Sequence, residues 1–128
     1  MVQQITKGIK ISVKTKFEGV RYTNYCMQYA FSYEISIENY SKDAVQLIGR
    51  SWRIFDSLKN TEVINGEGVV GKKPILAPKQ KHIYNSFCLL SSPMGAMSGF
   101  FRMINFTSTK EFKVYIPTFQ LMIPAILN

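Results

Sequence analysis

Residues 65–74, NGEGVVGKKP, contain the pattern in this sequence that comes nearest to a ligand-binding motif. Gly66, Gly68 and Gly71 have the G-x-G-x-x-G spacing of dinucleotide-binding loops, and the following Lys72 gives a near match to the phosphate-binding pattern G-x-x-x-x-G-K-[ST]. In both motifs the glycines let backbone N–H groups approach phosphate oxygens, and the next helix adds its positive N-terminus. The question is whether residues 66–73, called the glycine loop here, bind a phosphate.

The residues around the glycine loop do not meet the other requirements of these motifs. A dinucleotide fingerprint needs a helix after the glycines and an acid about 20 positions on, whereas Pro74 and Pro78 follow and the next acid is Glu111. A phosphate-binding loop needs Ser or Thr after its lysine to coordinate magnesium, and Lys73 occupies that position. Neither nucleotide motif is therefore predicted.

Two interpretations of the glycine loop remain open. Glycine supplies positive φ or a close backbone approach in a shaped loop, or consecutive N–H groups form a weak anion-binding nest. We favour the shaped loop, because glycines in loops need no ligand to explain them. The candidate anion-binding or partner-binding residues are Gly66, Gly68, Gly71, Lys72 and Lys73.

The histidine and the cysteines do not form a catalytic or metal-binding pattern. His82 is the only histidine, and lysines flank it, so we expect its pKa to be lowered. Cys88 lies six positions away on the same predicted strand, which is about 20 Å at the usual rise. One histidine and two distant cysteines do not have the spacing of a zinc site.

The carboxylates offer only weak alternatives. Asp43 with Glu38, and Asp56 with Glu62, could meet across hairpin turns and hold Mg²⁺ weakly, although solvated turns explain them more simply. We therefore predict a protein that is not an enzyme, with no catalytic residues, no metal site and no cofactor.

The chain has 128 residues and a net charge of +8, from 16 Lys and Arg against 8 Asp and Glu. This balance favours anionic partners, and residues 68–110 contain no acid at all. No targeting segment or apolar run of about 20 residues suggests a membrane protein, so we predict a cytoplasmic protein. Cys26 and Cys88 are then expected to be free thiols. An immunoglobulin-type disulfide around Trp52 is not favoured, because Cys26 is out of phase with the apolar face.

Apolar residues alternate with polar ones along most of the chain, which predicts strands. The strands expected are 9–17, 27–39, 45–56, 62–64, 81–90, 99–106 and 111–123. The alternation slips near Gly49, which indicates a bulge, and Pro117 indicates an edge or a bend. The prediction is a single domain over residues 1–128, an all-β, antiparallel immunoglobulin-like or fibronectin-III-like sandwich of about seven strands. The expected core includes Ile9, Ile11, Tyr29, Phe31, Tyr33, Ile35 and Trp52.

Nucleic acid is not a favoured partner. The segments VKTKF and RYTNYCMQYAF interleave basic and aromatic residues, as stacking platforms for nucleic acid do. Most of these aromatic residues lie on the apolar face of the alternation, however, so we expect them in the core. An unidentified protein and a small phosphate anion remain as partner classes, and no membrane insertion is expected.

Four segments resemble, in the same order, blocks of the bacterial ApaG proteins. They are YEISIENYSKDAVQLIGRSWRIFD, VINGEGVVGKKPILAP, YNSFCLLSSPMGAMSGFFRM and YIPTFQLMIP. The resemblance implies a fibronectin-III-like β-sandwich in the cytosol, with no established reaction. The family is linked by name to Co²⁺ resistance and Mg²⁺ efflux, and its glycine loop has been regarded as a candidate phosphate site. Here Ser51 precedes Trp52, where the family often has histidine.

Two classes of function follow from the residues and the resemblance together. The first is a non-catalytic interaction module, whose partner binds an exposed sheet edge or the loops. The second is a weak sensor of phosphate or nucleotide anions through residues 66–73. Direct binding of divalent metal has little support among the residues.

Overall fold

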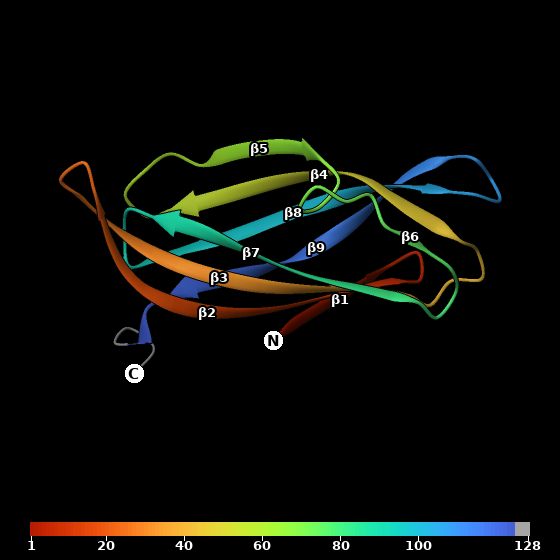
Figure 1. Cartoon of the computed structure of the whole chain (residues 1–128), viewed down its shortest axis with the longest axis horizontal. Coiled ribbons are helices and arrows are strands. Elements are labelled where there is room, and N and C mark those ends of the chain that lie inside the picture. The colour runs from red at the N-terminus through yellow and green to blue at the C-terminus, as the bar shows by residue number, and fades with distance from the viewer. Residues whose placement is uncertain (125–128) are drawn as a thin grey trace.

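The computed structural model describes residues 1–124, which form nine strands in two antiparallel sheets (Figure 1). In the first sheet, β1 (Val2–Thr6), β2 (Ile9–Thr23), β3 (Cys26–Asn39) and β7 (Lys81–Leu90) lie side by side in that order. In the second sheet the order is β5 (Glu62–Glu67), β4 (Val45–Asp56), β8 (Met94–Asn105) and β9 (Glu111–Met122), and β6 (Ile75–Leu76) also pairs with β4. Figure 1 shows the two sheets packed against each other along their length.

The predicted antiparallel sandwich is confirmed, and each of the seven expected strands is present. The sequence did not reveal β1 or β6. All but one of the residues of β1 are exposed, so that strand has no buried face to impose an alternation. The β6 strand has two residues, too few to show any period.

The core lies where the alternation predicted it. Ile9, Ile11, Phe31 and Ile35 are fully or almost fully buried. Tyr29 is only partly buried against the core, because the tip of the β2–β3 hairpin projects beyond the second sheet, as Figure 1 shows. Where a strand extends past the end of the opposite sheet, apolar and polar residues still alternate along it, but no second sheet covers the apolar side chains.

An aromatic cluster joins the two sheets. The Trp52 ring on β4 lies 5.6 Å from the ring of Tyr33 on β3 and 5.9 Å from that of Phe119 on β9. Tyr33 and Phe119 are themselves 5.7 Å apart. These tilted and edge-on arrangements are the favourable geometries for aromatic pairs, so Trp52 packs both against its own sheet and across the sandwich.

Both irregularities predicted from sequence are present. Leu47 pairs with Met103 but Gly49 pairs with Arg102, so Ile48 is an extra residue on β4. On β9, the register shifts across Pro117, and β9 is an edge strand of its sheet. Proline has no N–H to donate to a neighbouring strand, which is why an edge or a bulge tolerates it.

A buried asparagine fixes the chain that follows the glycine loop. The side chain of Asn39 is fully buried, and its Nδ2 donates to the carbonyl oxygens of Asp43 at 2.9 Å and Leu76 at 3.0 Å. Its Oδ1 accepts hydrogen bonds from the N–H and the hydroxyl of Ser41. Asn39 therefore holds the β3–β4 turn and the β6 strand in place together.

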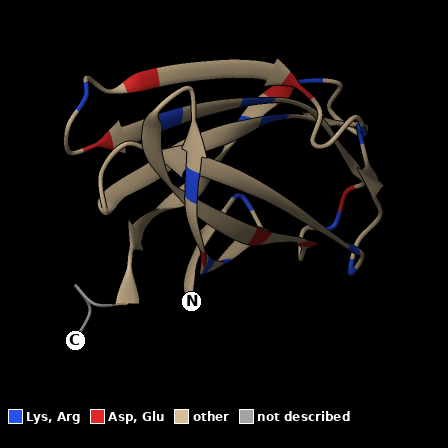
Figure 2. Ribbon diagram, turned by 60° about the vertical axis from the view of Figure 1, so that its left-hand side comes forward, with Lys and Arg blue, Asp and Glu red and all other residues tan. Residues whose placement is uncertain are grey.

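The basic residues do not collect on one sheet. Figure 2 shows Lys and Arg in loops at both ends of the sandwich as well as on strands. Two ion pairs are formed among the described residues, Lys73 with Glu67 and Arg102 with Glu111, and both are solvent-exposed. Exposed pairs of this kind contribute about 0–1 kcal/mol, so charge influences which partners are attracted more than it stabilises the fold.

Truncation of Tyr33 should be strongly destabilising. Tyr33→Ala removes a buried ring that contacts both Trp52 and Phe119, and we expect a loss of about 3–5 kcal/mol in the free energy of unfolding. Tyr33→Phe keeps the ring and should cost less than about 1.5 kcal/mol. Denaturant unfolding followed by Trp52 fluorescence measures both variants. A loss below about 0.5 kcal/mol for Tyr33→Ala would mean that the ring does not hold the sheets together.

Candidate functional site

The glycine loop lies at the edge of the second sheet, between two strands that pair with β4 in succession. The β5 strand pairs with residues 49–54 and β6 with residues 45–46. The bulged residue of β4 lies between these pairings, and the carbonyl oxygen of Ile48 accepts a hydrogen bond from the N–H of Gly68 at 3.1 Å. On the other side of the loop, the N–H of Leu47 donates to the carbonyl of Pro74 at 3.0 Å. The bulge thus anchors both ends of the loop.

The tip of the loop is a two-residue β-turn. Val69 donates to the carbonyl of Lys72 at 2.7 Å, and Lys72 donates to that of Val69 at 3.0 Å. Val70 and Gly71 between them have φ values of +48° and +73°, as the type I′ turn requires. Glycine suits this conformation, whereas a β-branched residue such as Val70 is strained in it. Val69 is buried, but Val70 is 63% exposed.

The position of Arg50 accounts for the glycine at position 66. Its Nη1 donates to the carbonyl oxygens of Glu67 at 2.9 Å and Gly68 at 2.8 Å. The guanidinium occupies the space in which a side chain at position 66 would start, since a Cβ on Gly66 would lie 2.7 Å from Arg50 Cζ. Sequence reasoning missed Arg50, because a glycine spacing does not indicate which distant side chain lies against it.

Gly68 has a different requirement, namely its backbone conformation. Its φ is +61°, and a Cβ there would collide with the carbonyl oxygen of Lys72. The shaped-loop interpretation therefore accounts for the three glycines by a close approach at Gly66 and by positive φ at Gly68 and Gly71.

Three of the loop's backbone N–H groups are engaged within the protein. The N–H groups of Gly68, Val69 and Lys72 all donate to backbone carbonyls, whereas an anion nest needs consecutive N–H groups directed at the ligand. The ammonium of Lys73 is paired with Glu67 at 3.1 Å. The chain continues into β6 and not into a helix, which agrees with the prediction that the glycine spacing marks no nucleotide motif. Lys72 is exposed at the turn.

Asp43 and Asp56, the aspartates of the weak carboxylate-pair alternative, are each engaged by other partners. Asp43 accepts hydrogen bonds from Asn105 at 3.1 Å and Thr107 at 3.0 Å, and these bonds lower its pKa. For Asp56, burial raises the pKa, but hydrogen bonds from Ser92 and from backbone N–H groups outweigh it, so the pKa is lowered. Both carboxylates are thus engaged in turns. Among residues 1–124, no three His, Cys, Asp or Glu side chains are grouped so that they could hold a metal ion.

His82 and the cysteines have the character expected of them. The pKa of His82 is lowered, as predicted, but the cause is burial followed by the charge of Lys72, not the sequence-adjacent lysines. Both cysteines are free thiols, as predicted, with Cys26 exposed and Cys88 buried. Burial raises the pKa of Cys88 to about 11, so this thiol stays protonated and is a poor nucleophile at neutral pH.

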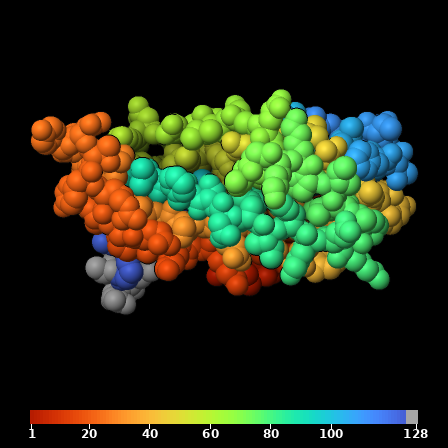
Figure 3. Space-filling model, viewed as in Figure 1, coloured from red at the N-terminus to blue at the C-terminus, as the bar shows by residue number. Residues whose placement is uncertain are grey.

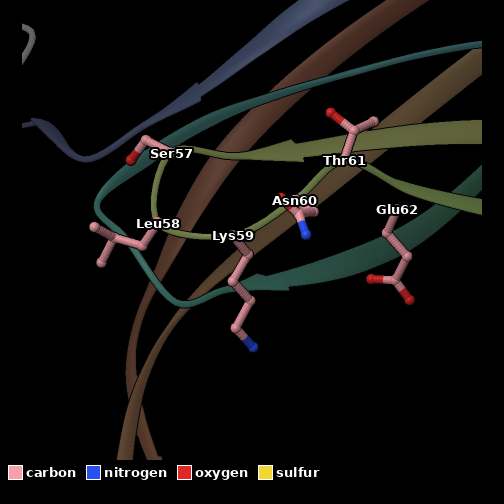
Figure 4. Close-up of a pocket in the computed structure, with 6 residues that line it drawn as sticks. All are labelled: Ser57, Leu58, Lys59, Asn60, Thr61 and Glu62. Atoms are coloured by element: carbon pink, nitrogen blue, oxygen red, sulfur yellow. The ribbon is translucent and has the colours of Figure 1, made fainter.

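A hollow of about 780 Å³ lies over the β4–β5 turn (Figure 4). Six consecutive residues, 57–62, line it, and Figure 4 shows their side chains spreading outward and not converging on a common centre. Lys59 and Glu62 are its only charged groups. The hollow is a feature of one exposed turn and brings no distant residues together.

Two other hollows lie beside β7, and each is lined by residues from several strands. One is a groove of about 630 Å³ on the outer face of the first sheet, lined by Phe87 and Leu89 of β7 and by Arg21 and Tyr22 of β2. The other is a cleft of about 350 Å³ between the sheets, lined among others by Tyr33, Arg50, Trp52, Ser86 and Cys88. Figure 3 shows residues 81–90 as a ridge on the surface between the glycine-loop region and the β2–β3 hairpin.

The fold and this site define a class of protein: a two-sheet antiparallel sandwich with a glycine-rich turn on one edge. The ApaG domain matches residues 21–105, and the chain belongs to the ApaG family. It is 39% identical to protein ApaG of Proteus mirabilis over 79% of this chain and 80% of that one, and 35% identical to ApaG of Anaeromyxobacter sp. (strain K) over the full length of both.

Solved structures agree with this assignment. An X-ray structure of a structural-genomics target superposes with a TM-score of 0.87 at 33% identity, covering 93% of this chain and 89% of that chain. The crystal structure of an ApaA protein from Bordetella pertussis gives 0.83 at 32% identity, covering 91% and 94%. Within residues 1–124, no helix has the length and apolar character needed to cross a membrane.

The strain at the turn predicts a stabilising substitution. Val70→Asn places a residue that tolerates positive φ before Gly71, and Asn-Gly is the preferred type I′ pair, so the free energy of unfolding should rise by about 1 kcal/mol. Val63→Asn is the matched control, because Val63 is similarly exposed but lies in β5, where asparagine is disfavoured. Equal loss of stability in both variants would show that Val70 is not strained.

Any anion bound at the glycine loop should be held weakly. Calorimetric titration with ATP and with pyrophosphate, each with and without Mg²⁺, should give a dissociation constant weaker than about 10 μM. The double change Lys72→Ala and Lys73→Ala should leave the fold intact, since both side chains are exposed. Tighter binding that this double change abolishes would mean that the loop is a true anion site.

Proposed function

We propose that this protein is a non-catalytic protein-interaction module that binds its partner along the open edge of the sandwich. The open edge is defined here as β5, β7 and the turn of the glycine loop. The observation that carries the proposal is the set of large apolar side chains exposed there: Val63, Ile64, Val70, Ile83, Phe87 and Leu89.

Such side chains are costly to leave in water. Ile64, Phe87 and Leu89 line one cleft, and apolar side chains that are gathered in one region are typical of an interaction site, whereas apolar residues scattered singly are not. Phe87 is 72% exposed and lines both the groove and the cleft. Aromatic anchors beside pockets are the residues that dominate binding energy at protein interfaces.

The strained turn supports the same proposal. Val70 presents an apolar side chain to solvent in a conformation that asparagine or glycine would adopt more easily. Strain of this kind persists where the surrounding structure enforces it, and it is concentrated at functional sites. In this proposal Val70 and Lys72 contact the partner, while Gly66, Gly68 and Gly71 shape the loop and Lys73 pairs with Glu67.

The family resemblance implies a link to Co²⁺ resistance and Mg²⁺ efflux. In our proposal this link runs through the bound partner in the cytoplasm and not through a metal ion held by this chain. The second candidate function, weak binding of a phosphate or nucleotide anion by residues 66–73, is supported by the exposed Lys72 beside a turn with two positive φ values. The titrations above separate the two.

Affinity capture with matched variants tests the interaction module. The wild-type protein is immobilised and incubated with native lysate, alongside the double variant Ile64→Ser with Phe87→Ser. The control is Phe106→Ser with Tyr115→Ser, two residues of comparable exposure on β9 and the β8–β9 turn. Mass spectrometry should show a defined protein retained by wild type and control and lost from the open-edge variant.

The captured protein is then purified and its binding measured directly with the same three proteins. A loss of affinity confined to the open-edge variant would support the module. Equal retention of every captured protein by all three would contradict it, because the apolar side chains would then have no part in binding.

A further inference from the structure

The β7 strand has an unpaired side. It pairs with β3 alone, and it ends the first sheet. No backbone–backbone hydrogen bond outside the sheets involves residues 81–90 in the part of the chain that the structure describes. Alternate residues of a paired strand direct N–H and C=O groups away from the partner, so β7 presents a row of such groups to the open edge.

The other sheet edges are protected, and β7 is not. The β1 strand has five residues and lies against β9, where the Thr6 hydroxyl accepts a hydrogen bond from the N–H of Tyr115 at 3.2 Å. The β9 strand contains Pro117 and a register shift, and β5 has six residues, including Gly66. By contrast, β7 has ten residues in unbroken register with β3, and no proline or glycine. Folded proteins usually interrupt such edges, because these edges pair with other chains.

The two hollows meet along β7, since Ser86, Phe87 and Leu89 line both of them. Along the strand, Ile83, Phe87 and Leu89 are exposed on the outer face, whereas Tyr84, Cys88 and Leu90 are buried on the inner face. A strand laid beside β7 directs successive side chains to alternate faces. Its side chains would therefore lie alternately on the outer face, beside Phe87 and Leu89, and on the inner face at the mouth of the cleft, and such alternate side-chain contacts give added strands their specificity.

The charged residues around β7 indicate which kind of segment could bind there as an added strand. Lys81 begins β7, Lys79 precedes it, and the charge of Lys72 lowers the pKa of His82. These lysines are exposed. The acids Glu34 and Glu38 are on β3, on the far side of β7 from an added strand. Glu18 and Glu62 line the groove and the cleft beside residues 85–89, so carboxylates of an added strand are favoured only at the lysine end of β7. A second copy of this chain is disfavoured as the occupant, because each copy carries a net charge of +8.

We propose that β7 accepts an extended acidic segment of a partner protein as an additional strand. Apolar side chains of the segment lie against Phe87 and Leu89, and its carboxylates lie at the end where Lys72, Lys79 and Lys81 are found. This inference rests on the proposed interaction module and names the surface and the chemistry of its partner.

Selection from a displayed library of ten-residue peptides tests the inference. Enriched peptides should alternate apolar and polar residues and carry Asp or Glu at one end. Each is then synthesised with a fluorescent label, and its affinity is measured by anisotropy. N-methylation of alternate backbone amides should weaken binding at least about tenfold, because it removes the donors that an added strand needs. A helical peptide bound by side chains alone would not show this alternate-residue pattern.

Matched variants locate the binding. Phe87→Ser with Leu89→Ser should weaken binding about tenfold or more, whereas the control Phe106→Ser with Tyr115→Ser, which is exposed but outside the open edge, should not. The β5 variant, Val63→Ser with Ile64→Ser, should have a smaller effect than the β7 variant. Lys79→Glu with Lys81→Glu should weaken it, and Lys14→Glu with Lys16→Glu, the same change in charge on the exposed part of β2, should have a smaller effect that salt removes. Hydrogen exchange should slow at the β7 amides when peptide binds.

Several outcomes would overturn the inference. They are selection of no peptides or of basic ones, binding insensitive to N-methylation, and unchanged binding by the β7 variant. Dimerisation lost in the β7 variant would replace the acidic segment with a second copy. If the captured native partner is lost only from the β5 variant, strand addition on β7 is wrong while the interaction module stands. If no partner and no peptide bind, both fail.

Discussion

The structure depends on one extra residue in β4. Before the bulge at Ile48, Val45 and Leu47 are buried; after it, the inward positions are Arg50, Trp52 and Ile54. A shift of one residue reverses the faces of a strand. Without the bulge, β4 could not direct both Leu47 and Trp52 into the core, and Trp52 joins the aromatic contacts across the sandwich.

The same bulge positions the glycine loop. It directs Arg50 to the glycine loop, where the guanidinium holds two loop carbonyls, and it frees the Ile48 carbonyl to hold Gly68. The loop is therefore braced from β4 at its base, and its tip can keep Val70 in a strained conformation. A turn that is fixed in this way presents its exposed side chains at a low entropic cost of binding.

Four titratable side chains are either removed from solvent by burial or engaged in hydrogen bonds. The Cys88 thiol is protonated because burial raises its pKa, and His82 has a lowered pKa because of burial and the charge of Lys72. Asp43 and Asp56 are engaged by hydrogen bonds in turns. The surface of β7 and its surroundings carries exposed apolar side chains and lysines, on which the proposed recognition of a partner rests.

The sequence by itself determined the strands, the bulge near Gly49, the place of Pro117 and most of the core, because the period-two pattern of buried residues is local and can be counted. It also indicated that the glycine loop is not a nucleotide motif, since the required helix and hydroxyl are absent from the neighbouring residues. Only the tertiary structure decided that Arg50 packs against Gly66, that β7 is an unprotected edge, and that β5, β7 and the turn adjoin. Strand order and register join residues far apart in the chain, such as Tyr33 with Ser86, and no local pattern encodes which partner a strand will have.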